Sequence, residues 1–168
     1  TSLTKPLNVY GHSKVLAERE VLEAYPEALV VRSSSFFGPW DQNNFITQSL
    51  ARLATGDNVS AAEDLTVSPT YIPDLAHWSL NLLLDREAGV WHLTNSGQIS
   101  WADLARSAAK LAGFNSEKVE GRPWTECNYT ARRPLYSVLG TQRTQFLPSL
   151  DNALEKYIFE TEKNGVAR

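Results

Sequence analysis

Tyr10 and Lys14 are residues of this sequence whose types and spacing could do acid–base chemistry. They stand four apart in the stretch Tyr-Gly-His-Ser-Lys, so both side chains fall on one face if the segment is helical. A lysine ammonium beside a tyrosine favours the phenolate, and such a pair can exchange a proton with a substrate near neutral pH. The same spacing also fits an ordinary amphipathic helix with a solvated lysine, because five-residue motifs recur by chance.

A helix followed by a buried strand is predicted around this pair. The helix is predicted from Asn8, a favourable N-cap, to about Tyr25, and Pro26 ends it. Residues 27–34 form a nearly continuous apolar run, which is typical of a strand in a parallel sheet. Gly38 and the proline after it predict a loop at the carboxyl end of that strand.

The rest of the chain alternates between predicted strands and helices. Further helices are predicted over residues 44–54, 74–84, 100–113 and 149–162, and strands within residues 57–72 and 90–94. Asp74 is predicted to cap the second of these helices, and Ser100 with Asp103 to cap the third. The alternation predicts an α/β fold.

Three aromatic residues follow the first predicted strand. Phe36, Phe37 and Trp40 could cap the core, or they could line a site, because ligands of α/β sheets bind at the carboxyl ends of strands. Trp101 lies on an apolar helical face and is predicted to be core.

The composition excludes several classes of protein. The 168 residues suit one domain with a real core, and a net charge of −3 gives no electrostatic case for nucleic acid or an anionic membrane. The single cysteine, Cys127, excludes an internal disulfide, and the three histidines have no spacing that suggests a metal site. The apolar runs are too short to span a bilayer, and the first residues lack an apolar signal segment. The sequence contains no methionine, so we expect the natural protein to extend upstream.

An ordered set of segments resembles the C-terminal half of extended short-chain dehydrogenases/reductases, and most closely the dTDP-4-dehydrorhamnose reductases. The resemblance covers about Tyr10 to Ile158. It implies a partial Rossmann-like fold, in which residues 1–40 are the tail end of the Rossmann domain, with the catalytic helix and the following strand, and residues 41–168 are mainly the region that binds the nucleotide-sugar, unless the whole chain is one continuous domain. Its segments are Tyr10-Gly-His-Ser-Lys14 with Ala17-Glu18, Val31-Arg32-Ser33-Ser34 with Gly38, Asn44-Phe45-Ile46, Asp64 with Ser68-Pro69-Thr70-Tyr71, Asp74-Leu75-Ala76, His92-Leu93, Gly97 with Ser100-Trp101, and Arg133-Pro134 with Ser137-Val138-Leu139. The Tyr-to-Lys spacing alone is a weak signal, whereas the ordered set is far more specific.

The resemblance implies an NADPH-dependent (or NADH-dependent) reduction of dTDP-4-dehydro-L-rhamnose to dTDP-L-rhamnose. In that family the tyrosine donates a proton to the keto oxygen, and the lysine supports it and contacts the nicotinamide ribose. The cofactor-binding residues that the resemblance implies are Tyr10, Lys14, Ser34 and Ser35. The substrate-binding residues are Phe36, Phe37, Asn44, Asp64, Thr70 and Arg133. Asn44 could equally be only a helix cap, and Asp64 only a turn residue. Arg133 is the strongest candidate of this group, because a guanidinium suits a diphosphate.

The sequence also departs from the family pattern. It contains no glycine-rich dinucleotide loop, so the cofactor-binding half is expected to lie outside this chain. Ser35 stands where the reductases usually carry a tryptophan that packs on the sugar. Leu65 replaces an expected glutamine, and Val67 an expected glycine. These changes put the sugar specificity in doubt.

Two other functions stay open on the same scaffold. One is a non-catalytic binding protein like the regulatory beta subunit of methionine adenosyltransferase, and the other is a nucleotide-sugar epimerase or dehydratase. The expected partners are a dTDP-sugar, the missing cofactor-binding half and a second copy of the chain docked at an exposed sheet edge. The substrate's supply implies a cytoplasmic location.

Overall fold

The computed structural model describes residues 4–127, 129–141, 143 and 147–163. The helices are α1 (Val9–Ala24), α2 (Phe45–Ala54), α3 (Ile72–Leu84), α4 (Trp101–Leu111) and α5 (Leu150–Lys163), with 3₁₀ turns η1 (Ser116–Lys118) and η2 (Trp124–Glu126). The strands are β1 (Leu29–Arg32), β2 (Phe36–Phe37), β3 (Val59–Ala62), β4 (Thr66–Val67), β5 (Thr70–Tyr71), β6 (Gly89–His92), β7 (Ile99–Ser100), β8 (Val119–Arg122) and β9 (Tyr136–Ser137). The predicted α/β fold is confirmed.

Local capping residues begin three of the helices as predicted. The side chains of Asn8, Asn44 and Ser100 accept hydrogen bonds from backbone N–H groups three residues on, at 2.8, 3.0 and 3.1 Å. Each bond satisfies a donor that the first turn of a helix otherwise leaves free. These starts could be predicted because the capping pattern lies within four residues of the chain.

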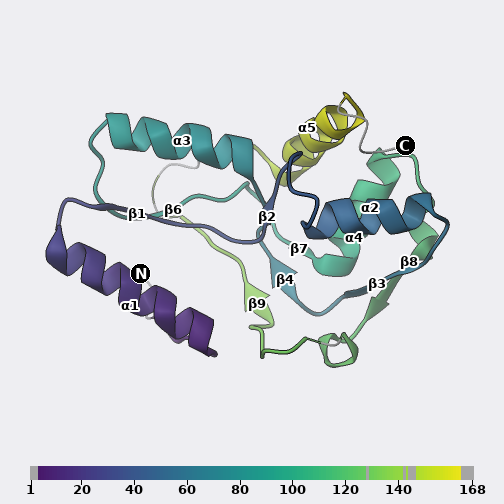
Figure 1. The fold of residues 1–168 in the computed structure, drawn as a ribbon, viewed down its shortest axis with the longest axis horizontal. Helices are drawn as coiled ribbons and strands as arrows, with labels where there is room; N and C mark the ends of the chain where they lie inside the picture. The colour runs from purple at the N-terminus through teal and green to yellow at the C-terminus, as the bar shows by residue number, and fades with distance from the viewer. Residues whose placement is uncertain (1–3, 128, 142, 144–146, 164–168) are drawn as a thin grey trace.

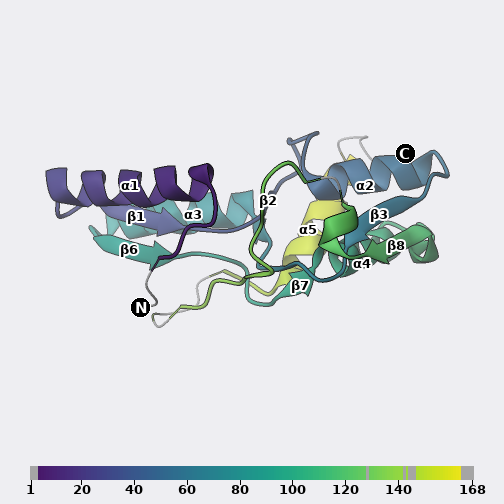
Figure 2. The ribbon, with the colours of Figure 1, turned by 90° about the horizontal axis from the view of Figure 1, so that it is seen from below.

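One part of the molecule is a parallel pair of strands between two helices. β1 pairs with β6 in register from Leu29 opposite Gly89 to Arg32 opposite His92. The two strands run between α1 and α3 (Figures 1 and 2). The face that carries Leu29 packs with α3 in a small core. That core consists of Leu82, Trp91, Leu93 and Leu147, with Leu29, Val31, Leu75 and Trp78 packed against it.

The other part of the molecule contains the larger core. β3 and β8 form a second parallel pair, and α2, α4 and α5 gather beside it (Figure 1). The largest core cluster joins residues of α2, α4 and α5 to Phe37 and Tyr71. Trp101 is partly buried against this cluster and meets Phe45 edge-on at 4.8 Å between ring centroids, as its predicted core position requires.

A short strand, β2, lies between β1 and the predicted loop at Gly38. Ser35 adopts a left-handed conformation with φ of 45°, and the chain then extends again as β2, which pairs in parallel with β5. The backbone N–H of Thr70 donates to the carbonyl of Ser35 at 3.0 Å. The loop predicted at Gly38 therefore follows β2 and not β1.

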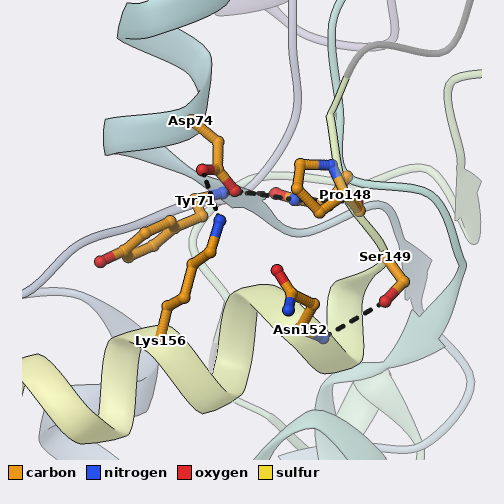
Figure 3. A network of polar contacts seen from close by, with 7 residues as sticks. Tyr71, Asp74, Pro148, Ser149, Asn152 and Lys156 are labelled. Atoms are coloured by element: carbon orange, nitrogen blue, oxygen red, sulfur yellow. Dashed lines mark hydrogen bonds and ion pairs between the residues drawn. The ribbon is translucent and has the colours of Figure 1, made fainter.

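The prediction that Asp74 caps α3 is wrong. The helix begins at Ile72 after Tyr71, which makes no side-chain cap, and Asp74 lies in its first turn. The proline after Ile72 is the better signal for this start, because proline is favoured at the first helical positions. Asp74 instead accepts from Lys156 of α5 at 3.1 Å and from the Asn95 amide at 3.4 Å (Figure 3).

Asn95 is the centre of the buried contacts that join α3 to α5. Its side chain is 1% exposed. Its amide oxygen accepts from the Tyr71 N–H at 2.8 Å, and its amide nitrogen donates to the Pro148 carbonyl at 3.0 Å. The network fixes the start of α3 to the segment that leads into α5.

We predict that the chain self-associates through the β1–β6 part. Within the described residues β1 pairs only with β6, so its other edge is free. Exposed Leu16 and Val21 on α1 and Leu83 on α3 flank this sheet. Free edges and apolar patches favour pairing with another chain. Sedimentation equilibrium should show association that rises with concentration, and Leu16→Glu should weaken it.

A matched control for that experiment is Leu111→Glu. Leu111 is also an exposed leucine, but it lies on α4, away from the β1–β6 part. This variant should associate like the original chain. A monomer at all concentrations would contradict the prediction.

Candidate functional site

Tyr10 and Lys14 both lie in the first two turns of α1. The Lys14 ammonium is 5.3 Å from the centroid of the Tyr10 ring, so the two side chains share one side of the helix. Both are exposed, and Tyr10 is 71% exposed. The pair therefore has the arrangement that the spacing predicted, and the tyrosine hydroxyl is open to a substrate or to another part of a protein.

A polar bridge in the middle of α1 attaches this helix to the sheet. Arg32 of β1 donates to the Glu18 carboxylate from Nε at 2.9 Å and from Nη2 at 2.6 Å. The hydrogen bond with Glu18 raises the pKa of Arg32, so the guanidinium stays charged. Nη1 of Arg32 lies 3.5 Å from Nε2 of His92, whose Nδ1 is 2.8 Å from the Gly140 carbonyl oxygen. The bridge thus continues from α1 through both strands to the segment after β9.

The loop that carries Arg133 lies against the start of α1. The Asn8 amide nitrogen donates to the backbone carbonyl of Arg132 at 3.1 Å, across 124 residues of chain. The exposed Arg133 guanidinium lies 4.7 Å from the centroid of the Tyr129 ring. Burial raises the pKa of Tyr129, which keeps this ring neutral beneath the guanidinium. The structure therefore brings the predicted diphosphate-binding loop to the helix that carries the predicted proton donor.

Asp64 holds the segment that leads into this loop. Its carboxylate accepts from the backbone N–H of Trp124 at 2.8 Å and so fixes the start of η2. The side chain is exposed, but this contact occupies one carboxylate oxygen. In the structure Asp64 positions the loop before Arg133.

Ser34 and Ser35 lie at the carboxyl end of β1, on the edge where ligands of parallel sheets bind. Their hydroxyl oxygens are 3.4 Å apart. Phe36 follows them and is 55% exposed, so it is available to contact a ligand. Ser35 is partly buried and offers only a small hydroxyl at this strand end.

Phe37, Asn44 and Thr70 lie in the interior. Phe37 is 2% exposed and packs against Tyr71 and Tyr157, with ring centroids 5.4 and 5.6 Å away. Asn44 caps α2, and its amide nitrogen donates to the Gly38 and Asp41 carbonyls at 3.1 and 2.6 Å.

Thr70 has no exposed surface, and its hydroxyl donates to the Ser68 carbonyl at 3.3 Å. In the described structure Phe37, Asn44 and Thr70 are buried side chains that support the strand ends, and their predicted contact with a substrate stays a prediction. Leu65 and Val67, two of the departures from the family pattern, are likewise buried in the core.

Sequence reasoning missed the role of three polar side chains near the site. Glu18 and Arg32 were quoted only as parts of the resembling segments, and Asn8 only as a helix cap. Their partners lie 14 and 124 residues away, so no local pattern points to them.

The described residues contain neither a metal-binding cluster nor a membrane-spanning helix. No group of three or more histidine, cysteine, aspartate or glutamate side chains there could hold a metal ion. No helix in the described ranges is both long and apolar enough to cross a membrane.

The described residues thus form an α/β fold with an exposed tyrosine and lysine on one side of its first helix. The sequence model of the RmlD substrate binding domain matches residues 1–159, and the chain belongs to this family. A dTDP-4-dehydrorhamnose reductase of Mycolicibacterium smegmatis is 35% identical over 143 residues, which are 84% of this chain and 43% of that protein. A dTDP-4-keto-6-deoxy-D-glucose reductase of Streptomyces niveus is 31% identical and covers 83% of this chain and 49% of its own length.

Solved structures show the same relationship. The dTDP-4-dehydrorhamnose reductase of Bacillus anthracis, in complex with NADP, superposes with a TM-score of 0.86 at 29% identity. The match covers 94% of this chain and 57% of that one. The reductase of Clostridium acetobutylicum gives 0.86 at 27% identity, covering 96% and 58%. The chain thus spans about half the length of the curated relatives and somewhat more than half of these structures.

Proposed function

We propose that this chain is the substrate-binding half of an NADPH-dependent nucleotide-sugar reductase. Its parent reaction is the reduction of dTDP-4-dehydro-L-rhamnose to dTDP-L-rhamnose. The observation that carries the proposal is the contact between α1, with Tyr10 and Lys14, and the Arg132–Arg133 loop, in a chain of the RmlD family. Tyr10 is the proton donor to the keto oxygen, and Lys14 stabilises its ionised form.

Arg133 is the group that we assign to the substrate diphosphate. Its guanidinium is exposed, and its position over the Tyr129 ring limits the orientations that it can take. Arginine binds phosphate oxygens through two parallel N–H groups, which suits a nucleoside diphosphate. Phe36 and Ser34 lie at the strand end where the sugar would bind.

The cofactor fits these residues only in part. The Lys14 ammonium is exposed and suits the hydroxyls of the nicotinamide ribose. β1 and β6 lead into loops rather than into glycine-rich helix starts, so nothing in the described residues cradles a pyrophosphate. The proposal therefore requires a second, dinucleotide-binding part. When NADPH is bound, its nicotinamide supplies the hydride, while Tyr10 supplies the proton.

The function is tested by restoring that second part. The chain is fused to the part of the Bacillus anthracis reductase that it does not cover, since that enzyme's structure contains NADP. The fusion should oxidise NADPH in the presence of dTDP-4-dehydro-L-rhamnose, and the chain alone should not. A fusion that binds both NADPH and dTDP but turns over no keto sugar would contradict the proposal. That outcome favours a non-catalytic binding protein, to which the small Ser35 at the sugar position also points.

Replacing Arg133 by alanine is predicted to lower the affinity for dTDP by about 10- to 100-fold, the loss expected for hydrogen bonds to a charged group. Arg133→Lys should lose less, because lysine keeps the charge without the paired donors. Isothermal titration calorimetry of each variant measures the effect.

The matched control for this prediction is Arg52→Ala, because Arg52 lies in the last turn of α2, away from the loop. Its dTDP affinity should equal that of the original chain. Equal losses in Arg52→Ala and Arg133→Ala would show that only general positive charge attracts the nucleotide.

A further inference from the structure

The Asn8 side chain makes two contacts that serve different parts of the molecule. Its amide oxygen accepts from the Gly11 N–H at 2.8 Å and caps α1. Its amide nitrogen donates to the Arg132 carbonyl at 3.1 Å. A helix cap needs only an acceptor, and aspartate, serine or threonine would serve as well. A side-chain amide also supplies a donor, on a nitrogen separate from the capping oxygen, whereas aspartate has no donor and a hydroxyl carries its donor on the capping atom itself.

Apart from Asn8, little in the described residues holds the start of α1 to the rest of the molecule. No residue of α1 is buried, and the Glu18–Arg32 bridge lies two turns beyond Tyr10. The chain before the helix folds tightly onto its first turn. A Cβ on Gly11 would lie 3.1 Å from the Pro6 Cβ and 3.4 Å from the Asn8 amide oxygen. The glycine of the Tyr-Gly-His-Ser-Lys stretch thus permits the close turn that places the Asn8 amide.

We propose that Asn8 is a positioning residue that couples the helix carrying Tyr10 and Lys14 to the Arg132–Arg133 loop. The coupling itself follows from the two hydrogen bonds, and its consequence for the site rests on the proposed function. With Asn8 in place, the loop that holds the substrate diphosphate keeps a fixed position relative to the proton donor. Without the amide donor, the helix still forms, but the loop is released from it.

Two variants test the contact between Asn8 and the Arg132 carbonyl separately from the capping of α1. Asn8→Asp and Asn8→Ser both retain an oxygen that can cap α1. Aspartate has no donor for the Arg132 carbonyl, and the serine hydroxyl lies one bond closer to the backbone than the amide nitrogen, so it does not take the place of that donor. Backbone ¹⁵N relaxation of the whole chain reports on both parts at once. The order parameters of residues 131–133 should fall from about 0.85 to below about 0.6, while those of residues 11–14 stay unchanged. The affinity for dTDP should fall by about two- to tenfold in both variants.

Asn115→Ser is the matched control. Asn115 also caps a turn, since its amide oxygen accepts from the Glu117 N–H at 2.9 Å at the start of η1. This variant should change neither the order parameters of residues 131–133 nor the dTDP affinity. The coupling is overturned if the loop keeps its order in both Asn8 variants, or if helix and loop lose order together. If the original chain binds no dTDP, the proposed function is wrong. The ¹⁵N relaxation measurement would still show whether Asn8 holds the Arg132–Arg133 loop to α1.

Discussion

Replacing Tyr10 by phenylalanine in the fused reductase is expected to lower the rate of keto-sugar reduction by about 10²–10⁴-fold, the usual contribution of a positioned acid. Phenylalanine keeps the ring that the Lys14 ammonium approaches at 5.3 Å, but it has no proton to donate. Because Tyr10 is exposed at the start of α1, the substitution disturbs no core packing. Steady-state kinetics with saturating NADPH measures the loss.

Measuring the binding of dTDP distinguishes a loss of proton transfer from a loss of substrate binding. The affinity of the Tyr10→Phe variant for dTDP should be unchanged, because the assigned diphosphate contact is made by Arg133. Tyr25→Phe is the control, since Tyr25 is also exposed but lies at the far end of α1. Its turnover should match that of the unsubstituted fusion. Normal turnover in Tyr10→Phe would remove Tyr10 from the mechanism.

Replacing Asn95 by alanine should destabilise the chain by about 2–4 kcal/mol, because two buried backbone groups lose their partner. The Tyr71 N–H and the Pro148 carbonyl both bond to the Asn95 amide, which is 1% exposed. Urea unfolding followed by circular dichroism gives the difference in the free energy of unfolding.

Asn152→Ala is the control for this stability effect. Asn152 is exposed on α5 near the same network (Figure 3). Its substitution should change the free energy of unfolding by no more than about 0.5 kcal/mol. Equal stabilities of Asn95→Ala and Asn152→Ala would mean that the buried amide does not hold the two helices together.

Local signals accounted for most of the secondary structure. Asn8, Asn44 and Ser100 were predicted as helix starts because a capping side chain bonds to a neighbour three residues away. Asp74 misled the prediction because an aspartate in the first turn of a helix resembles a cap. Its hydrogen-bond partner in the structure, Lys156, lies 82 residues away, so no local sequence pattern indicates the contact.

The part of the candidate site that lies in one short motif could be predicted from the sequence. The contacts between residues far apart in the chain could not. The four-residue spacing of Tyr10 and Lys14 predicts their shared face of the helix. Phe37 and Thr70 were predicted as substrate contacts from the resemblance, and the structure places them in β2 and β5 with their side chains buried, which no local pattern indicates. The contact between Asn8 and the Arg132 carbonyl depends on the path of the whole chain, which periodicity does not describe.

Calorimetric titration of this chain with dTDP, with the Arg133→Ala variant and NADPH in parallel titrations, tests the proposed function at its first step. We expect the chain to bind dTDP, the Arg133→Ala variant to bind it far more weakly, and NADPH not to bind in the absence of a dinucleotide-binding part. Binding of dTDP with equal affinity to the chain and to the Arg133→Ala variant, or no binding to the folded chain, would contradict this expectation.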